Sequence, residues 1–359
     1  MSSLRISIVS TVFILLMFGL VMVYSSSAIY ASQLFGDSLY YFKRHLLNLI
    51  IGVIAALFFM SIDCDILKKH AKLIILTTIG LLVCALIPGI GHTAGGASRW
   101  ISFIFFNVQP SELAKLSVLI YLAYFVDKNE SRMINLFRGY LPVLVVCGTI
   151  MGLVLLEPDL GTTMTIGFMM FLMLFIGGAN FKHIAVTILS TVPFIYYLIF
   201  SVPYRRKRIM AFINPWLDER DTGFQIVQSY IALGSGGLLG VGLGQSKQKL
   251  FFLPASHTDF ILSIIGEELG FIGVTALIIL FFALVWQGTR AAFKINDTFR
   301  KMLVFGIVFM IAFEVIVNVG VSVGLFPTKG LPLPFVSYGG TSLIVHMIAI
   351  GLLLNATRD

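Results

Sequence analysis

The sequence predicts an all-α polytopic membrane protein with about ten transmembrane helices, and three observations lead to this prediction. Only 12% of the 359 residues are charged, whereas a soluble domain has about 25%. The apolar residues, 58% of the chain, gather in runs close to the roughly 20 residues that a spanning helix needs. The basic residues behind the net charge of +8 lie in short loops between these runs, where they indicate topology and anionic-lipid contacts rather than nucleic-acid binding.

Ten candidate helices follow one another within a single integral membrane domain that covers residues 1–359. The first follows Arg5 and is too long for the roughly 7–15-residue core of a signal peptide, so we expect it to be retained. The third and fourth are short and flank a polar, glycine-rich loop, His92–Ser98, where a partly re-entrant segment is an alternative. The ten runs are Ile6–Ser26, Leu46–Ile62, Leu73–Ile87, Leu113–Val126, Tyr140–Leu156, Leu160–Ile176, Ile184–Phe200, Phe260–Gln287, Met302–Leu325 and Ser342–Leu354.

The longest connection, about residues 201–258, joins the seventh and eighth helices, and no segment is long enough to fold as a separate soluble domain. The three cysteines, Cys64, Cys84 and Cys147, form no CxxC pair and have no zinc-ligand spacing. We therefore expect neither a disulfide nor a zinc site.

Lysine and arginine in the short loops predict the orientation. The loops after helices two, four, six and eight carry most of them and alternate along the chain, so they share one side, the cytoplasm. Both termini are then cytoplasmic, and the long connection is extracytoplasmic. The basic residues of these four loops are Lys68, Lys69, Lys72, Lys128, Arg132, Arg138, Lys182, Arg290, Lys294, Arg300 and Lys301.

A basic run at residues 204–208, YRRKR, lies in the long outer connection against this bias. One interpretation is that long loops escape the positive-inside rule. The other is an anion site, because guanidinium groups match phosphate oxygens in a bidentate geometry. Further cations on the same side favour a phosphate-bearing lipid headgroup. The candidate phosphate contacts are Arg99, Lys115, Arg205, Arg206 and Arg208.

Asp259 is the central candidate among the polar residues on the outer side, and it lies at the start of the eighth helix. It or Thr258 could simply cap that helix. Alternatively, Asp259 is a general base that removes a proton from a sugar hydroxyl, since ionisable groups at a membrane are candidates for function. His257 could orient a partner, although a single interfacial histidine is more often solvated.

Two further carboxylates, Glu267 and Glu268, lie about two turns into the same helix. Helical spacing places Glu267 on the face of Asp259, where it is a candidate substrate contact, and Glu268 toward a neighbouring helix. The alternative for at least one of them is a structural ion pair with a basic residue. Glu112 and Lys115 are spaced i, i+3 and can pair locally.

Glu157 and Asp159 form a second acidic site on the outer side. They either cap the sixth helix or hold a divalent cation.

Two irregular segments complete the outer side. The glycine-rich stretch Gly234–Gly244 fits neither a P-loop nor the dinucleotide fingerprint, so we expect irregular backbone that lets other groups approach closely. In Leu331–Ser342 two prolines prevent a helix. Irregular backbone at membrane depth is tolerated only when it is buried or lines a cavity. We therefore expect this segment, with Ser337 as a candidate substrate contact, to wall the cavity of Asp259.

Six segments together resemble the SEDS family of membrane glycosyltransferases, whose members include FtsW, RodA and SpoVE. They occur in the family's order over most of the chain, and ten helices match its topology. The QSKQK, GEELG and PTKGLPLPF stretches resemble FtsW and SpoVE more than RodA. The segments are Gly95–Phe103, Gln109–Leu116, Leu156–Thr162, Gly242–Phe260, Ile265–Gly273 and Pro327–Ser342.

The resemblance implies polymerisation of lipid II into peptidoglycan glycan strands at the outer face of the bacterial cytoplasmic membrane, for cell division or cell shape. It implies a class B penicillin-binding protein as partner, other divisome or elongasome proteins, and a glycan linked to undecaprenyl pyrophosphate. Asp259 matches the family's catalytic aspartate through its HTD motif. Ala255 departs from the acidic residue that often follows the proline, which puts a second loop carboxylate in doubt.

These indications combine into one mechanistic hypothesis. Asp259 removes the proton of the acceptor sugar hydroxyl, and the outer cations compensate phosphate charge. Mg²⁺ or Mn²⁺ could share that work through Glu157 or Asp159. Two other classes compete: a lipid II flippase or proton-coupled transporter, and a non-catalytic scaffold. The clustering of acids and bases on one side, without a clear internal repeat, argues against a transporter.

Overall fold

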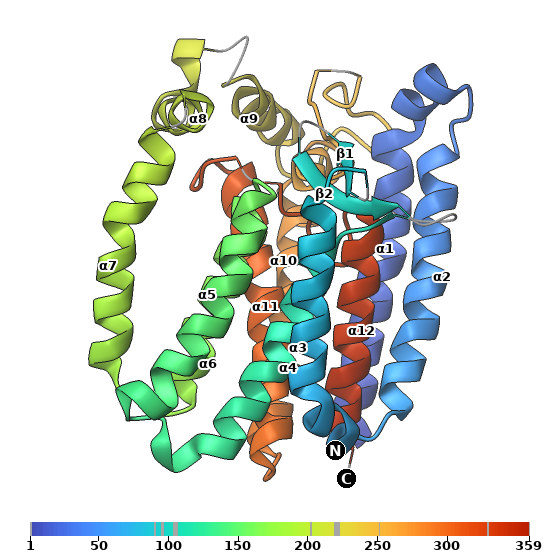
Figure 1. The fold of residues 1–359 in the computed structure, drawn as a ribbon. Helices are drawn as coiled ribbons and strands as arrows, with labels where there is room; N and C mark the ends of the chain where they lie inside the picture. Colours follow the sequence, from blue (N-terminus) through green and yellow to red (C-terminus); the bar gives the residue numbers. More distant parts are fainter. Residues whose placement is uncertain are drawn as a thin grey trace.

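The computed structural model describes residues 2–89, 91–94, 97–102, 107–201, 203–218, 223–250, 252–328 and 330–358. Most of them form helices that run side by side in one bundle, with both chain ends at the same end of it (Figure 1). We call the end that carries the termini the proximal end and the opposite end the distal end. The shared end of the termini agrees with the predicted topology.

All ten predicted runs are helical. Six helical stretches of the described residues are long and apolar enough to cross a membrane: α1, α2, α3, the stretch Leu136–Leu156 that contains α5, α10 and α11. Two further apolar helices, α6 and α12, are shorter. The ten helices are α1 (Ser2–Phe35), α2 (Tyr40–Ser61), α3 (Cys64–Leu86), α4 (Pro110–Asn129), α5 (Leu141–Leu156), α6 (Leu160–Ile176), α7 (Phe181–Phe200), α10 (Ile261–Phe293), α11 (Thr298–Ser322) and α12 (Gly340–Ala356).

Local signals in the sequence explain where several helices begin. The side chains of Asp63, Asn180 and Asp297 accept hydrogen bonds from backbone N–H groups in the first turns of α3, α7 and α11. Such caps satisfy donors that have no partner inside the helix. Pro110 occupies the first turn of α4, where its missing N–H has no cost.

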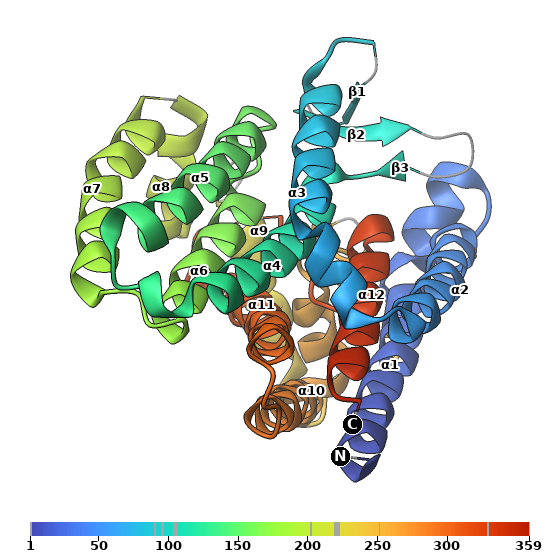
Figure 2. The ribbon, with the colours of Figure 1, turned by 60° about the horizontal axis from the view of Figure 1, so that its bottom comes forward.

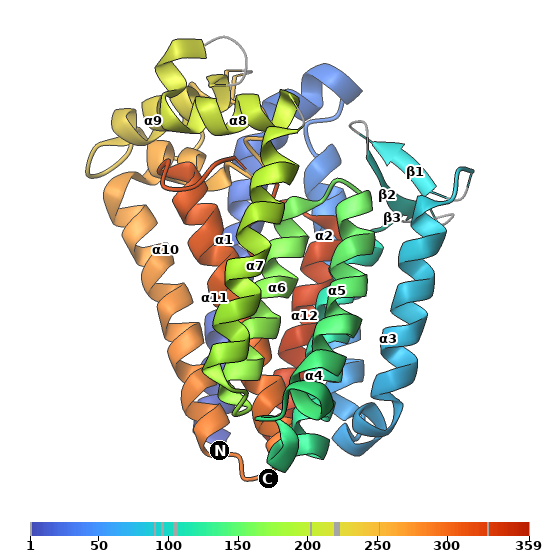
Figure 3. The ribbon, with the colours of Figure 1, turned by 60° about the vertical axis from the view of Figure 1, so that its left-hand side comes forward.

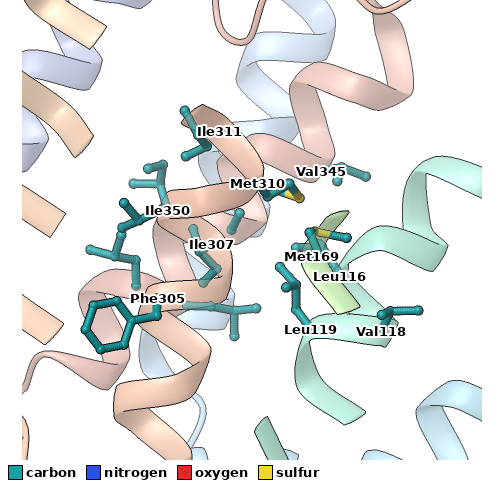
Figure 4. Packing of buried hydrophobic residues seen from close by; sticks show 14 of the residues in the cluster. Leu116, Val118, Leu119, Met169, Phe305, Ile307, Met310, Ile311, Val345 and Ile350 are labelled. Carbon is teal, nitrogen blue, oxygen red and sulfur yellow. The ribbon is translucent and has the colours of Figure 1, made fainter. Parts of the chain in front are cut away.

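The core lies between α4, α6, α11 and α12, whose aliphatic and methionine side chains interdigitate (Figure 4). Lipid is as apolar as leucine, so close packing rather than water exclusion holds such helices together. Small residues permit that packing. A Cβ atom on Gly306 of α11 would lie 2.6 Å from Leu119 of α4, and one on Gly351 of α12 would lie 2.4 Å from the Ala56 carbonyl of α2.

The segment between α3 and α4 is a small antiparallel sheet at the distal end, beside α3 (Figures 1 and 2). Its strands are β1 (Gly91–Ala94), β2 (Ala97–Ser102) and β3 (Asn107–Val108), in the order β1-β2-β3. The re-entrant alternative for His92–Ser98 is therefore wrong for the described residues. A β-ladder satisfies the backbone groups of a polar segment that has no helical periodicity.

The long connection also contains helices that the sequence did not reveal. The helix α8 (Pro203–Ile213), a short 3₁₀ turn (Pro215–Asp218) and α9 (Phe224–Gly236) lie across the distal end of the bundle (Figure 3). Ser229 of α9 bonds Ser263 of α10 at 2.6 Å and donates to the Ser322 carbonyl of α11 at 2.7 Å. The connection is thus anchored to the bundle.

The helix α10 is interrupted at Gly270, whose φ of 66° is outside the helical range. The glycine-rich segment supplies the hydrogen bonds that the interruption removes. The N–H groups of Val241 and Gly242 donate to the carbonyls of Glu267 and Glu268, and the N–H groups of the two residues after Gly270 donate to the carbonyls of residues 237 and 238. The predicted close approach of this segment is therefore confirmed, because it restores the bonding of a broken helix. The irregular backbone begins only after Gly236, since Gly234–Gly236 belong to α9.

Replacing Gly236 with alanine should destabilise the protein by about 1–3 kcal/mol, because its Cβ atom would lie 1.9 Å from the carbonyl oxygen of Gly266 in α10 and backbone must move. Gly234 is a matched control on the same helix, because its Cβ would meet nothing within 4 Å. Gly234→Ala should be neutral or stabilise by up to about 1 kcal/mol. Thermal unfolding in detergent measures both, and equal melting temperatures would contradict this packing.

Candidate functional site

Asp259 lies at the distal end, half-buried, two residues before α10 begins. The N-cap position of that helix belongs to Phe260, which makes no side-chain cap. The capping interpretation of Asp259 is therefore wrong. The carboxylate instead lies near the segment before α12, since a Cβ atom on Gly330 would be 3.4 Å from Asp259 Oδ2.

The backbone on either side of Asp259 is fixed by long-range hydrogen bonds. Asn318 Nδ2 of α11 donates to the carbonyls of Asp259 at 2.9 Å and Leu331 at 2.8 Å. The Ser337 hydroxyl donates to the Thr258 carbonyl at 2.6 Å and accepts from the Leu333 N–H. The segment Leu331–Ser342 is thus bonded to the backbone around Asp259, and buried Ser337 fixes the loop rather than facing a substrate. Asn318 was missed, because a single amide in an apolar helix gives no sequence signal.

The charges of two arginines and one aspartate affect the pKa of Asp259. Burial raises the pKa of Asp259 to about 6, while Arg208 and Arg99 lower it and Asp159 raises it. These residues come from α8, β2 and the turn before α6, so segments far apart in the sequence converge. A carboxylate with a pKa close to neutral is suited to accept a proton.

Arg99 is anchored at the turn between α5 and α6. Its Nε donates to the Glu157 carbonyl at 2.8 Å and its Nη2 to the Pro158 carbonyl at 2.6 Å. The guanidinium is therefore held by backbone carbonyls rather than by a carboxylate, and the side chain is half-buried. Part of its positive charge therefore remains available to an anion.

Asp159 caps α6, which was one of the two predicted roles. Its carboxylate accepts from Thr162 N at 3.0 Å, Thr162 Oγ1 at 2.9 Å and Gln109 Nε2 at 3.2 Å. Glu157 is fully buried. No three acidic, histidine or cysteine side chains gather as metal ligands in the part of the chain that the structure describes. The pair fits a divalent cation poorly, and we derive no step through one.

Glu157 is better understood as a neutral carboxyl group. Neither of its oxygens has a well-aligned hydrogen-bond partner among the described residues. Burial, with Asp159, raises its pKa to about 8, against smaller effects of Ser111 and Arg99. The protonated form is therefore favoured in the folded state at neutral pH.

Glu157→Gln should make the protein more stable than wild type at about pH 9. Because the pKa of Glu157 is higher in the folded protein than in the unfolded chain, its protonated form adds to the free energy of unfolding. This contribution is complete below the ordinary glutamate pKa. It decreases as pH rises and is lost above about pH 8. Glutamine has no such dependence. Melting temperatures of both proteins from about pH 5 to 9 test this, and a constant difference between them would contradict a neutral Glu157.

The basic run at 204–208 forms the first turns of α8 instead of a loop. Arg206 is exposed and Arg208 half-buried, and Arg208 is close enough to Asp259 to affect its pKa. The side chain of Arg205 lies outside the described residues. The run is therefore placed at the same end of the molecule as Asp259.

Lys115 does not occupy the position predicted for a phosphate contact. It is 1% exposed, and its Nζ lies 2.9 Å from Glu112 Oε2 and 2.5 Å from Glu314 Oε1. His346 Nε2 contacts the other Glu314 oxygen at 2.6 Å. The predicted pairing with Glu112 is confirmed, and the buried network explains why the charge cannot reach a substrate.

Glu267 and Glu268 also have structural positions. The Glu267 carboxylate accepts bonds from the Ser246 hydroxyl and from the N–H groups of Lys247 and Gln248. Lys249 Nζ lies 2.7 Å from Glu268 Oε1, as predicted for one of these acids. Glu267 thus orders the loop that leads to Asp259 rather than contacting a substrate, because its carboxylate is buried and occupied by the bonds to that loop.

His257 is buried rather than solvated, and burial lowers its pKa to about 4. Its ring lies among tyrosine side chains, with its centroid 4.5 Å from that of Tyr41. It is therefore neutral at physiological pH and cannot balance phosphate charge.

The chain matches the family described as Cell cycle protein, FtsW/RodA/SpoVE, over residues 6–359. It is 47% identical over 340 residues to a Geobacter metallireducens protein named "Probable peptidoglycan glycosyltransferase FtsW", a match that covers 95% of this chain and 91% of that one. It is 43% identical over 345 residues to "Stage V sporulation protein E" of Bacillus subtilis, covering 96% of this chain and 94% of the relative.

Solved structures share the fold. A chain from a structure described as "Structural coordination of polymerization and crosslinking by a peptidoglycan synthase complex" superposes with a TM-score of 0.80 and 27% identity, over 98% of this chain and 97% of the other. The rod shape determining protein RodA of Thermus thermophilus gives 0.73 and 26%, over 98% and 96%. The predicted class, an all-α polytopic membrane protein, is confirmed.

Proposed function

Because the chain belongs to the FtsW/RodA/SpoVE family, we propose that it is a peptidoglycan glycosyltransferase that polymerises lipid II into glycan strands. The relatives named peptidoglycan glycosyltransferase cover nearly its whole length. The observation that carries the proposal is Asp259, a half-buried carboxylate with a pKa near 6 beside Arg99 and Arg208. Such a site can take a proton while it attracts an anion.

Asp259 is the base in this proposal. It takes the proton of the acceptor sugar hydroxyl, the hydroxyl oxygen bonds to the anomeric carbon of the donor, and the bond from that carbon to the pyrophosphate breaks. The lipid pyrophosphate leaves with the electron pair. Asn318 and Ser337 hold the backbone of Asp259 and Thr258, so the carboxylate is positioned before the substrate binds.

Arg99 and Arg208 balance the charge that develops on the pyrophosphate. Arg205 and the exposed Arg206 belong to the same helix, α8, as Arg208. The distal end then faces the outside of the bacterial cytoplasmic membrane and both termini the cytoplasm, which agrees with the basic loops at the proximal end. The protein acts with a class B penicillin-binding protein. Support for this comes from the similar chain of a polymerising and crosslinking synthase complex.

Purified lipid II incubated with the protein and its penicillin-binding partner tests the proposal. The partner should carry a substitution of its active-site serine, so that glycan synthesis is not confused with crosslinking. Glycan chains on a gel are expected. If none form while liposomes that contain the protein translocate lipid II, the protein is a flippase instead. If neither activity is found while the partner is recruited, it is a scaffold.

The rate of polymerisation should rise with pH and level off above about 7. Only ionised Asp259 accepts a proton, and its pKa is about 6, so below that value the rate should fall about tenfold per pH unit. Initial rates between about pH 5 and 8 measure this. Arg208→Ala should move the apparent pKa upward, because the guanidinium lowers it. A flat profile would contradict a base at Asp259.

A further inference from the structure

Four rings from separate parts of the chain meet two residues before Asp259. His257 lies at their centre, with its centroid 4.5 Å from Tyr41 of α2, 5.7 Å from Tyr30 of α1 and 5.8 Å from Tyr338, which precedes α12. Tyr41 and Tyr338 also contact each other edge to face at 5.0 Å. Tyr30 and Tyr41 belong to the distal ends of α1 and α2, two helices that lie side by side (Figure 1). We call the four residues the aromatic cluster.

Core packing alone does not account for the aromatic cluster. All three tyrosines are only half-buried. The buried Nδ1 of His257 has no hydrogen-bond partner among the described residues, which is rare for a buried polar atom. The aromatic cluster therefore combines partly exposed tyrosine side chains with one imidazole nitrogen that core packing leaves unsatisfied.

The edge of the aromatic cluster is cationic. The Arg44 guanidinium lies 4.5 Å from the centroid of the Tyr40 ring, and its charge also acts on the nearby Tyr338 hydroxyl. An acyl chain would gain nothing from this cation or from the tyrosine hydroxyls. A sugar with acidic substituents would gain from both.

Sugar rings match the chemistry of tyrosine faces. The π face of an aromatic ring is electron-rich, and the C–H bonds on one face of a pyranose are polarised by the ring's oxygens. Stacking buries that C–H face, while tyrosine hydroxyls bond the equatorial hydroxyl and amide groups. The buried, neutral imidazole of His257 packs among the tyrosine rings and places no charge beside the sugar.

We propose that Tyr30, Tyr41, Tyr338 and His257 form a stacking subsite for the acceptor hexosamine whose hydroxyl is deprotonated by Asp259. This deepens the proposed function and rests on it. The Tyr338 N–H donates to the His257 carbonyl at 2.9 Å, so two members of the aromatic cluster are joined to the loop that carries the base. The rings contact no reacting atom, and they act by holding the sugar in position.

Kinetics of Tyr41→Leu test the subsite. The KM for lipid II should rise about tenfold, which corresponds to about 1.4 kcal/mol, while kcat should change by less than about twofold, since stacking is present in the ground and transition states alike. Tyr41→Phe keeps the ring and should retain the wild-type KM. Phe42→Leu is the matched control, because the adjacent Phe42 pairs with Tyr24 instead, at 5.9 Å.

Binding is then measured without catalysis. A soluble tetrasaccharide of β-1,4-linked N-acetylglucosamine is followed by saturation-transfer NMR on the Asp259→Ala protein, with and without Tyr41→Leu. Loss of the signal in the double variant is expected, and an unchanged signal overturns the subsite. If wild type makes no glycan, the proposed function fails but this arm still decides whether the sugar binds. The kinetic and NMR measurements are repeated with Tyr338→Leu, so that a folding defect in one variant does not end the test.

Discussion

Asp259→Asn should reduce polymerisation by at least about 100-fold, because general acid–base catalysis contributes roughly 10²–10⁴-fold and an amide cannot accept the proton. Asparagine has nearly the same shape as aspartate. Since the bonds that hold this loop use the backbone carbonyls of Asp259 and Thr258, the substitution should leave the loop in place. Removing a half-buried carboxylate with a raised pKa should not lower stability.

The assay is lipid II polymerisation by wild type, Asp259→Asn and Asp259→Ala, each with the partner that lacks its active-site serine. Melting temperature and co-purification of the partner show that the variants are folded and assembled. Ser256→Ala is a control in the same loop. Normal polymerisation by Asp259→Asn would rule out the proton-accepting role and leave the carboxylate without an assigned function. Slow polymerisation with a normal pH profile would assign the base to another group.

Much of the fold could be predicted because the bilayer imposes a simple rule. A spanning segment must be apolar and must satisfy its own backbone, so all ten runs were recognisable from composition alone. The sheet before α4, and α8 and α9 in the connection before Asp259, are outside this rule. They are stabilised by contacts such as that of Ser229 with Ser263, and no local pattern announces such a contact.

Some of the site residues could be predicted from the sequence and others could not, again because long-range contacts leave no local pattern. Asp259 could be identified from the motif around it and from the rarity of acids in this chain. Glu267, Ser337 and Lys115 are equally conspicuous, but their roles depend on partners far away in the sequence. The Glu267 carboxylate bonds Ser246 and Gln248, which lie 21 and 19 residues earlier in the chain. Helical spacing cannot foresee a loop that folds back onto the helix.

The aromatic cluster shows the same limit in another form. Tyrosines at the ends of apolar helices are expected at a membrane interface, so Tyr30 and Tyr41 carry no distinctive signal. Their importance comes from His257 and Tyr338, which the loop contacts bring between them. Only the folded chain shows that these rings gather around His257, two residues before Asp259.

Lys115→Met should destabilise the protein by about 3–5 kcal/mol, the usual consequence of removing one partner from a buried ion pair. The ammonium group lies between Glu112 and Glu314, and both are buried. Methionine fills the volume but leaves two carboxylates without a cation in a region that excludes water. His346 contacts only one of them.

Thermal unfolding and the KM for lipid II distinguish this structural role from the substrate contact that the sequence suggested. Lys68→Met is the matched control, because it removes a partly exposed pair with Asp127 and should cost less than about 1 kcal/mol. Adding Glu314→Gln to Lys115→Met should restore part of the lost stability, since it removes one unpaired charge. If Lys115→Met instead melts like wild type and raises the KM, the lysine reaches the substrate and the buried network is not its role.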